Sequence, residues 1–171
     1  MPRYVAFLRG VSPMNASMPA LKRCFEAEGY SQVRTLLSSG NVVFNARSSS
    51  LATLERRAVN AMRSGLDRSF DTFVRPAAYL QALIESDPFA GSRLSPAAKR
   101  LVIFLRRPAE PGLELPIERD DAGILKLNGC EVLAAYVPGP KAATFMRLLE
   151  RTFSADITTR TLDTVRKCAW A

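Results

Sequence analysis

The sequence predicts an α+β protein of two tandem ferredoxin-like (split β-α-β) halves with mostly antiparallel sheets, packed as one compact unit. Strand-type and helix-type apolar patterns alternate in the order β-α-β-β-α-β over residues 1–85. Residues 86–98, with two prolines and a glycine, are typical of a linker. After this linker a similar order begins again over residues 99–171, which we expect to form the second half.

The two halves also share sequence. Residues 5–9 (VAFLR) match residues 102–106 (VIFLR), and a glycine, Gly40 or Gly129, precedes a strand in each half. Two unrelated buried strands can share letters, because strands favour β-branched and aromatic residues. The repeated element order favours a duplication over this alternative.

In the first half, each element has a local signal. Ser17 and Ser50 are typical N-caps, and each precedes an apolar pattern at helical spacing. The Ser38-Ser39-Gly40-Asn41 stretch predicts a tight turn between two strands. The expected elements are strand 4–8, a helix from Ser17 to Gly29, strands 33–37 and 42–44, helix 51–66, strand 71–75 and a connecting helix 76–84.

In the second half, Asn128-Gly129 between two apolar runs is a strong hairpin signal. Thr161 is placed to cap a last helix. The expected elements are strand 101–105, an irregular crossover 108–121, strands 124–127 and 131–137, a helix from Pro140 to about 151, a short strand 155–157 and the last helix.

Composition excludes several classes of enzyme. The 171 residues contain no histidine, so Ser-His-Asp hydrolases, Cys-His proteases and His-ligated metalloenzymes are ruled out. Cys24, Cys130 and Cys168 are widely spaced, without a C-x-x-C pair, and are expected to be small buried side chains rather than nucleophiles. No nucleophile–base pair is visible, which favours a protein that is not an enzyme without deciding the question. We expect no cofactor.

A metal site is also not predicted. Glu118, Asp120 and Asp121 form the densest acidic group, but they lack an ordered ligand spacing and are expected to be a solvated loop. The chain has no secretory leader pattern and no apolar run long enough to cross a membrane. We therefore expect a soluble cytoplasmic protein that does not bind membranes.

The predicted topology gathers one candidate site. In a β-α-β-β-α-β unit, the end of strand one, the start of helix one and the turn between strands two and three lie at the same sheet edge. Helix N-terminal amides and an arginine there would attract a phosphate or carboxylate, so a small anionic ligand is the expected partner. The residues of this first-strand edge are Arg9, Gly10, Ser39, Gly40 and Asn41.

Ordinary structural roles remain open for the same residues. The glycines can supply positive φ, Asn41 can close its own turn, and Arg9 can pair with a nearby carboxylate. Arg160 is the sixth candidate, because it is expected at a helix start, where a cation is unfavourable unless it binds something. The equivalent edge of the second half carries Arg106, Arg107 and the Asn128-Gly129 turn.

Two other classes of function stay open: nucleic-acid binding through a basic surface, and a structural or oligomerisation module. The net charge is +8, with 12 basic and 7 acidic side chains in residues 1–96 and 12 and 9 in the remainder. No basic stripe dominates, and residues 40–45 lack the basic-Gly-aromatic pattern of RNA-recognition domains. Strands 4–8 and 101–105 are apolar on both alternations, so we expect both faces to be covered, which leaves no platform for bases.

Several segments together resemble the domain-of-unknown-function 1697 family of bacterial proteins. The matching segments are YVAFLRG (4–10), PAL (19–21), VRT (33–35), SGNVVF (39–44), DPF (87–89), TTR (158–160) and TV (164–165). The resemblance implies a single α+β family domain with two related halves, and it implies no activity. The chain departs from the family pattern at 11–15 (VSPMN for Ile-Asn-Val-Gly-Gly), at Ser38 (for Gln) and at 161–163 (TLD for Asn-Trp-Asn). The lost glycines matter because close backbone approach to an anion depends on them.

Overall fold

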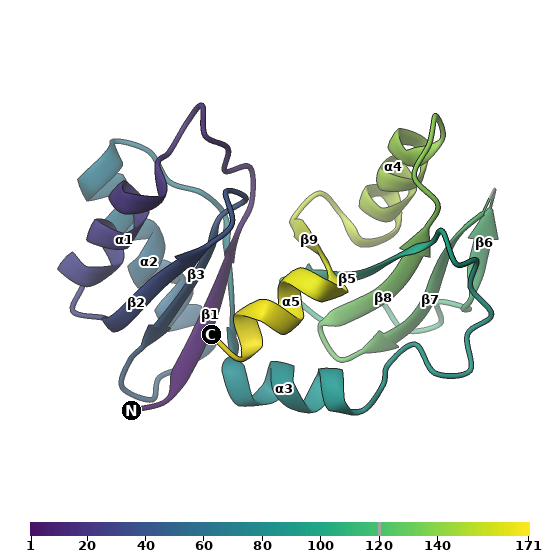
Figure 1. Cartoon of the computed structure of the whole chain (residues 1–171), viewed down its shortest axis with the longest axis horizontal. Coiled ribbons are helices and arrows are strands. Elements are labelled where there is room, and N and C mark those ends of the chain that lie inside the picture. The colour runs from purple at the N-terminus through teal and green to yellow at the C-terminus, as the bar shows by residue number, and fades with distance from the viewer. Residues whose placement is uncertain (120) are drawn as a thin grey trace. The chain divides into compact units, whose positions relative to one another are not determined.

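The computed structural model describes residues 1–119 and 121–171, so Asp120 of the predicted acidic loop lies outside the described residues. These residues form an α+β fold with two antiparallel sheets and five helices (Figure 1). Contacts divide the chain into one unit of Met1–Ile84 with Arg166–Ala171 and a second of Glu85–Val165. The sequence placed 86–98 in a linker and the last six residues in the second half, whereas packing assigns 86–98 to the second unit and the last six residues to the first.

The sheet of the first unit has the order β2-β3-β1-β4. Ser17 and Ser50 accept hydrogen bonds from the amides of Ala20 and Thr53, which confirms both predicted caps. The elements are β1 (Arg3–Leu8), α1 (Met18–Ala27), β2 (Ser31–Leu36), β3 (Asn41–Asn45), α2 (Leu51–Leu66), β4 (Thr72–Pro76) and α3 (Ala77–Glu85).

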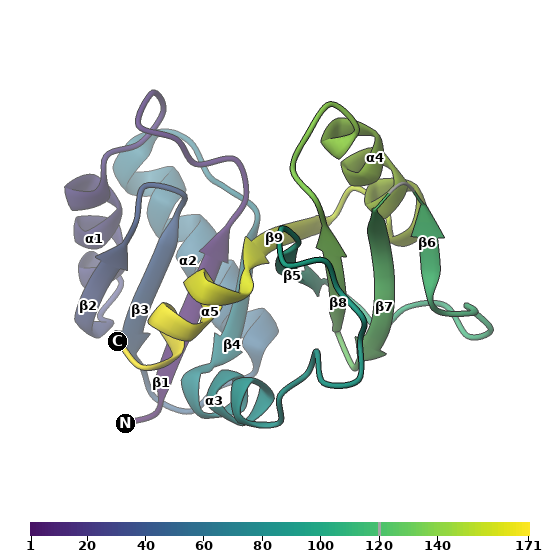
Figure 2. The same ribbon diagram turned by 45° about the vertical axis from the view of Figure 1, so that its right-hand side comes forward.

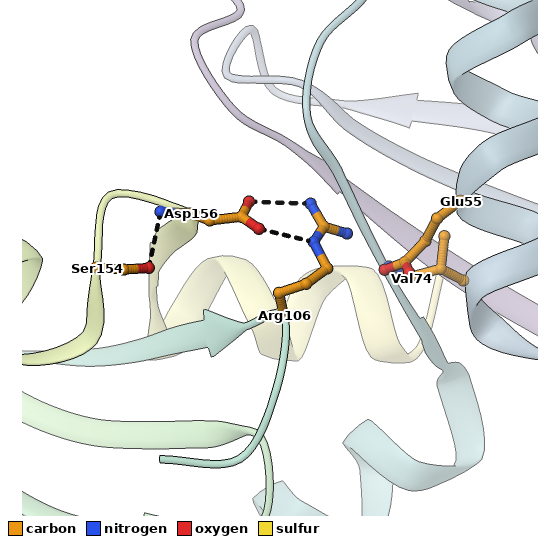
Figure 3. A network of polar contacts seen from close by, with 5 residues as sticks. All are labelled: Glu55, Val74, Arg106, Ser154 and Asp156. Carbon is orange, nitrogen blue, oxygen red and sulfur yellow. Dashed lines mark hydrogen bonds and ion pairs between the residues drawn. The ribbon is translucent and has the colours of Figure 1, made fainter. Parts of the chain in front are cut away.

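Helices α1 and α2 cover one face of this sheet (Figure 2). Its core contains an aromatic cluster in which Phe44 stacks on Tyr30 at 4.4 Å between ring centroids and meets Phe25 edge-on. The Glu55 side chain of α2 also accepts a hydrogen bond from the Val74 amide of β4 at 2.9 Å (Figure 3). The other face is buried as well, since Val5 and Phe7 of β1 have no exposed surface. The predicted double-sided burial of this strand is confirmed.

The sheet of the second unit has the order β6-β7-β8-β5-β9, and α4 packs through Phe145 and Leu149 against one of its faces. The hairpin at Asn128-Gly129 joins β7 to β8 as predicted. The elements are β5 (Lys99–Leu105), β6 (Ile117–Arg119), β7 (Ala122–Asn128), β8 (Glu131–Tyr136), α4 (Ala142–Phe153) and β9 (Ile157–Thr161), and α5 (Leu162–Ala169) continues the chain into the first unit.

Three local expectations need correction. The crossover contains β6, which is only three residues long and pairs with β7 at the sheet edge, so its sequence signal is weak. The strand expected at 155–157 instead runs over Ile157–Thr161, because β5 supplies a pairing partner for each of these residues. Arg160 therefore lies in a strand and not at a helix start, although Thr161 does cap α5 by accepting from the Thr164 amide at 3.3 Å.

None of the helices in the described part of the chain is both long and apolar enough to cross a membrane.

Candidate functional site

The end of β1 is bonded to the two neighbouring chain segments. The Leu8 amide donates to the Gly40 carbonyl at 2.8 Å, and the Arg9 amide donates to the Asp71 carbonyl at 2.9 Å. Arg9 and Gly10 thus follow β1 at the point where the turn before β3 and the residue before β4 meet it. The Arg9 side chain is half-buried at this position.

Gly40 and Gly10 serve the backbone differently, although both have positive φ (+86° and +83°). A Cβ on Gly40 would lie 2.9 Å from both Cβ and Cγ2 of Val11, so the loop after β1 packs directly on the turn before β3. A Cβ on Gly10 would meet no atom within 4 Å, and this residue is exposed.

Asn41 has no exposed surface and acts on its own turn. Its Nδ2 group donates to the Leu36 carbonyl at 2.9 Å and to the Ser39 hydroxyl at 3.1 Å. Both amide hydrogens are therefore used within the turn, which agrees with the alternative that Asn41 closes its own turn. Ser39 is exposed, and Asn41 holds its hydroxyl oxygen in place.

The loop that follows Gly10 is ordered by Asn15. Its Nδ2 donates to the Gly10 carbonyl at 2.8 Å, and its Oδ1 accepts from the Ser12 amide at 2.9 Å. These bonds fix the loop without the glycines of the family pattern. Arg68 reaches the same loop, since its Nη1 lies 3.4 Å from the Asn15 carbonyl. No local sequence signal points to Arg68, which is 53 residues away from Asn15.

The N-terminus of α1 contributes less than the sequence suggested. Pro19 has no amide hydrogen, and the Ala20 amide is already bonded to the Ser17 hydroxyl at 3.2 Å. The Leu21 amide donates to the Ser17 carbonyl. Residues 19–21 therefore offer no unused amide to an anion at this helix start.

Arg160 lies in β9 of the second unit and is 8% exposed. Its Nη1 donates to the Thr158 hydroxyl and to the Thr159 carbonyl, both at 2.9 Å. Arg75 in β4 is buried to a similar degree, and its Nη1 likewise donates to the carbonyl of the preceding residue, Val74, at 2.9 Å.

The strand registers reveal which positions of the two units correspond. Phe7 pairs with Asn41 as Phe104 pairs with Glu131, and Val5 pairs with Arg75 as Val102 pairs with Arg160. Arg9 therefore corresponds to Arg106, Asp71 to Asp156, Asn41 to Glu131 and Arg75 to Arg160. The match of Gly40 with Gly129 is wrong by one residue, because the Leu105 amide donates to the carbonyl of Cys130 as that of Leu8 does to Gly40.

The arginine that corresponds to Arg9 holds a carboxylate. Arg106 donates from Nε to Asp156 Oδ2 at 3.2 Å and from Nη2 to Oδ1 at 3.3 Å, so the two groups face each other as a fork (Figure 3). The Ser154 hydroxyl accepts a hydrogen bond from the Asp156 amide at 3.2 Å, which holds the backbone of Asp156 in place. In the first unit the Asp71 side chain is exposed, and among the described residues it makes no such bond.

Arg3, another charged residue of the first unit, is held by hydrogen bonds to a backbone carbonyl and to a side-chain amide. Its Nε donates to the Ala171 carbonyl at 2.7 Å, and its Nη1 donates to Asn45 Oδ1 at 2.8 Å. Burial lowers the pKa of Arg3 from its usual value, and the nearby Arg34 cation lowers it further. The hydrogen bonds identify Arg3 as a structural cation.

A family model described as "Protein of unknown function (DUF1697)" matches residues 1–126. The chain belongs to the DUF1697 family. The matched region of this DUF1697 protein includes five of the six candidate residues, and Arg160 lies outside it. No curated protein matches the chain.

A solved structure is similar in fold to this DUF1697 protein. It is that of the conserved bacterial protein SP0830 from Streptococcus pneumoniae, with a TM-score of 0.70 and 19% sequence identity. The similarity covers 99% of this chain and 97% of the other. The two proteins therefore share their architecture over nearly their whole length.

Proposed function

We propose that this DUF1697 protein binds a small anionic ligand at the first-strand edge, and that the ligand presents a carboxylate to Arg9. The observation that carries the proposal is the fork between Arg106 and Asp156, because Arg106 is the counterpart of Arg9. Guanidinium groups favour carboxylates, which accept two parallel hydrogen bonds. Asp156 is thus an internal example of the group that an arginine at this position binds.

Each candidate residue has a role in this proposal. Arg9 pairs with the carboxylate, and the exposed Ser39 hydroxyl donates to a second polar group of the ligand. Gly10 and Gly40 give the backbone its path around the site, and Asn41 positions Ser39 through its 3.1 Å bond. Arg160 belongs to the other unit, and its contribution needs a separate test.

A thermal-shift panel of carboxylated and phosphorylated metabolites tests the proposal. A ligand present at 100 times its Kd adds about 2.7 kcal/mol to the free energy of unfolding. A carboxylated hit is then titrated calorimetrically against Arg9→Ala, Arg9→Lys and Arg160→Lys. Loss of a charged hydrogen-bond partner costs about 1.5–3 kcal/mol, so we expect Arg9→Ala to weaken binding about 10- to 150-fold.

Arg47→Ala is the matched control, because Arg47 is an exposed cation beyond the opposite end of β3. The same weakening in this variant would show that the ligand responds only to net charge. Arg9→Lys keeps the charge and loses the fork, so its affinity should lie between those of the wild type and Arg9→Ala. A panel without a carboxylated hit would contradict the proposal.

Nucleic-acid binding remains the second candidate function, favoured by the net charge of +8. Base stacking on the first sheet is not available to it, because Phe7 and Phe73, on the sheet face opposite α1 and α2, have no exposed surface. Binding would therefore use the phosphate backbone, and retention on a polyanion column should fall steeply as salt rises. Retention that does not depend on salt would count against this function.

A structural or oligomerisation module is the third candidate. Its support is a set of exposed large apolar side chains, which include Met14 and Trp170. A strictly monomeric mass in solution scattering across a wide concentration range would argue against it.

We also infer that the two units are divergent copies of one ferredoxin-like unit. The order β2-β3-β1-β4 corresponds to β7-β8-β5-β9, and α2 corresponds to α4. In chain order, the segment with β6 lies between β5 and β7, as α1 lies between β1 and β2. The paired arginines Arg9 and Arg106, and Arg75 and Arg160, support a common origin.

A further inference from the structure

A second feature of the first unit is a cavity of about 550 Å³ between α1 and α2, which we name the helix-pair cavity. This volume lies within the range of roughly 300–1,000 Å³ that small-molecule sites occupy. Arg9 and the other residues of the first-strand edge do not line it. Its lining includes Arg23, Cys24, Glu28, Asn60, Ser64 and Gly65, with alanine side chains between them.

The floor of the cavity is apolar and contains a buried thiol. Cys24 is 5% exposed, and a Cβ on Gly65 would lie 2.7 Å from its Sγ atom. Gly65 therefore lets the thiol lie against α2. The Cys24 thiol has no hydrogen-bond partner among the described residues. Burial raises its pKa, and the nearby Arg23 cation only partly offsets this effect, so the thiol is a neutral part of the floor.

The charge at the rim is positive. Glu28 is already neutralised, because its Oε1 accepts from Arg57 Nε at 2.6 Å. Arg23 is exposed and makes no hydrogen bond or ion pair within the described part of the chain. Asn60 and Ser64 add an amide and a hydroxyl to the same wall.

We propose that the helix-pair cavity binds a small organic molecule that carries one carboxylate on a flat apolar body. Arg23 pairs with the carboxylate, and Asn60 and Ser64 bond to its remaining lone pairs. The apolar body lies on the floor formed by the small side chains and Cys24. A phosphate fits less well, because Arg23 is the one cation among the described lining residues, and one cation beside an apolar floor does not replace the hydration of a dianion.

Titration of the whole protein with 2-naphthoate tests this proposal. We expect saturable binding with one molecule per chain, and 2-naphthamide, which lacks the charge, should bind at least tenfold more weakly. Arg23→Ala should weaken 2-naphthoate binding tenfold or more. Ser64→Leu should do the same by filling the cavity from an exposed position where folding is not at risk.

Arg56→Ala is the matched control, because Arg56 is an exposed cation of α2 outside the cavity lining. This control and Arg9→Ala should both bind within about twofold of the wild type, which separates this site from the first-strand edge. The proposal is overturned if 2-naphthoate does not saturate, if the amide binds as tightly, or if Arg23→Ala is no weaker than Arg56→Ala.

Alkylation by iodoacetamide gives a second readout that does not depend on the variants. Bound 2-naphthoate should slow the modification of Cys24 about tenfold or more, measured by mass spectrometry at saturating ligand. Cys130 is half-buried and outside the cavity, so its rate is the internal reference. Equal slowing at both cysteines, or none at Cys24, would place the ligand elsewhere.

Discussion

Gly40 is the residue that joins the two loops of the first-strand edge. Its φ of +86° disfavours every side chain, and its neighbour Val11 leaves no room for one. Gly10 has nearly the same φ without any close neighbour. The two glycines therefore separate the cost of backbone strain from the cost of a steric clash.

Replacing each glycine by alanine tests this separation. Gly10→Ala should lower the free energy of unfolding by roughly 1–2 kcal/mol, the cost of a left-handed backbone for an L-residue. Gly40→Ala should lose the same amount and about 1–3 kcal/mol more, because Val11 must move. Urea denaturation measures both values. Equal losses in the two variants would mean that Val11 yields without cost.

At the residue scale, the sequence predicted the turn and offered turn closure by Asn41 as one of two roles, without deciding between them. Ser-Ser-Gly-Asn is a turn signal in itself, so the positions of Gly40 and Asn41 follow from local chemistry. That both Nδ2 hydrogens of Asn41 stay inside the turn depends on the placement of Leu36 and Ser39. Arg68 was missed because its contact with the loop is entirely a product of tertiary structure.

At the scale of elements, Tyr30 ties α2 to the segment between α1 and β2. Its ring packs against Phe25 of α1, and its hydroxyl donates to the Leu54 carbonyl of α2 at 3.3 Å. Arg57 of α2 lies over the same ring at 5.0 Å and donates to Glu28. That bond raises the pKa of Arg57. Tyr30 thus connects α1 and α2 from its buried position in the segment between α1 and β2.

This link should make stability depend on pH in the alkaline range. Burial raises the pKa of Tyr30 above its usual value near 10; Arg57 opposes the shift and Glu28 adds to it. The unfolded chain then loses the phenolic proton before the folded one does, so the contribution of Tyr30 is complete below about pH 10 and declines above it.

Tyr30→Phe isolates this effect from other titrating groups. At pH 7 the variant should be less stable by about 1 kcal/mol, the net value of one hydrogen bond. The difference from the wild type should shrink as the pH rises from 10 to 11, when followed by urea denaturation. A difference that stays constant over this range would contradict the assignment.

The elements themselves were largely predictable where their signals are local. The caps at Ser17 and Ser50 and the hairpin at Asn128-Gly129 follow from short-range hydrogen bonding and turn geometry. The bounds of β9 were not predictable, because Thr158-Thr159-Arg160 suits a helix start as well as a strand. Pairing with β5, more than fifty residues earlier in the sequence, decides between them.

At the scale of the whole molecule, the strand registers allow each position of the first unit to be compared with its counterpart in the second. Each unit has an arginine after the end of its first strand and an aspartate before its last strand, at equivalent register positions. In the second unit the two side chains form an ion pair, whereas within the described part of the chain the Asp71 side chain makes no bond to Arg9. The duplication that we propose rests in part on the similar letters of residues 5–9 and 102–106, whereas the match of Gly40 with Cys130 required the strand register.

The two arginine–aspartate positions should therefore differ in their energetic coupling. A double-mutant cycle with Arg106→Ala and Asp156→Ala should give a coupling of roughly 0.2–1 kcal/mol, because the side chains are partly exposed and solvent screens them. Added salt should reduce this value. The cycle with Arg9→Ala and Asp71→Ala should give a coupling near zero, because the Asp71 side chain makes no bond among the described residues. Urea denaturation at low and high salt measures both cycles, and equal coupling in the two would mean that Asp71 already occupies the place that we assign to the ligand carboxylate.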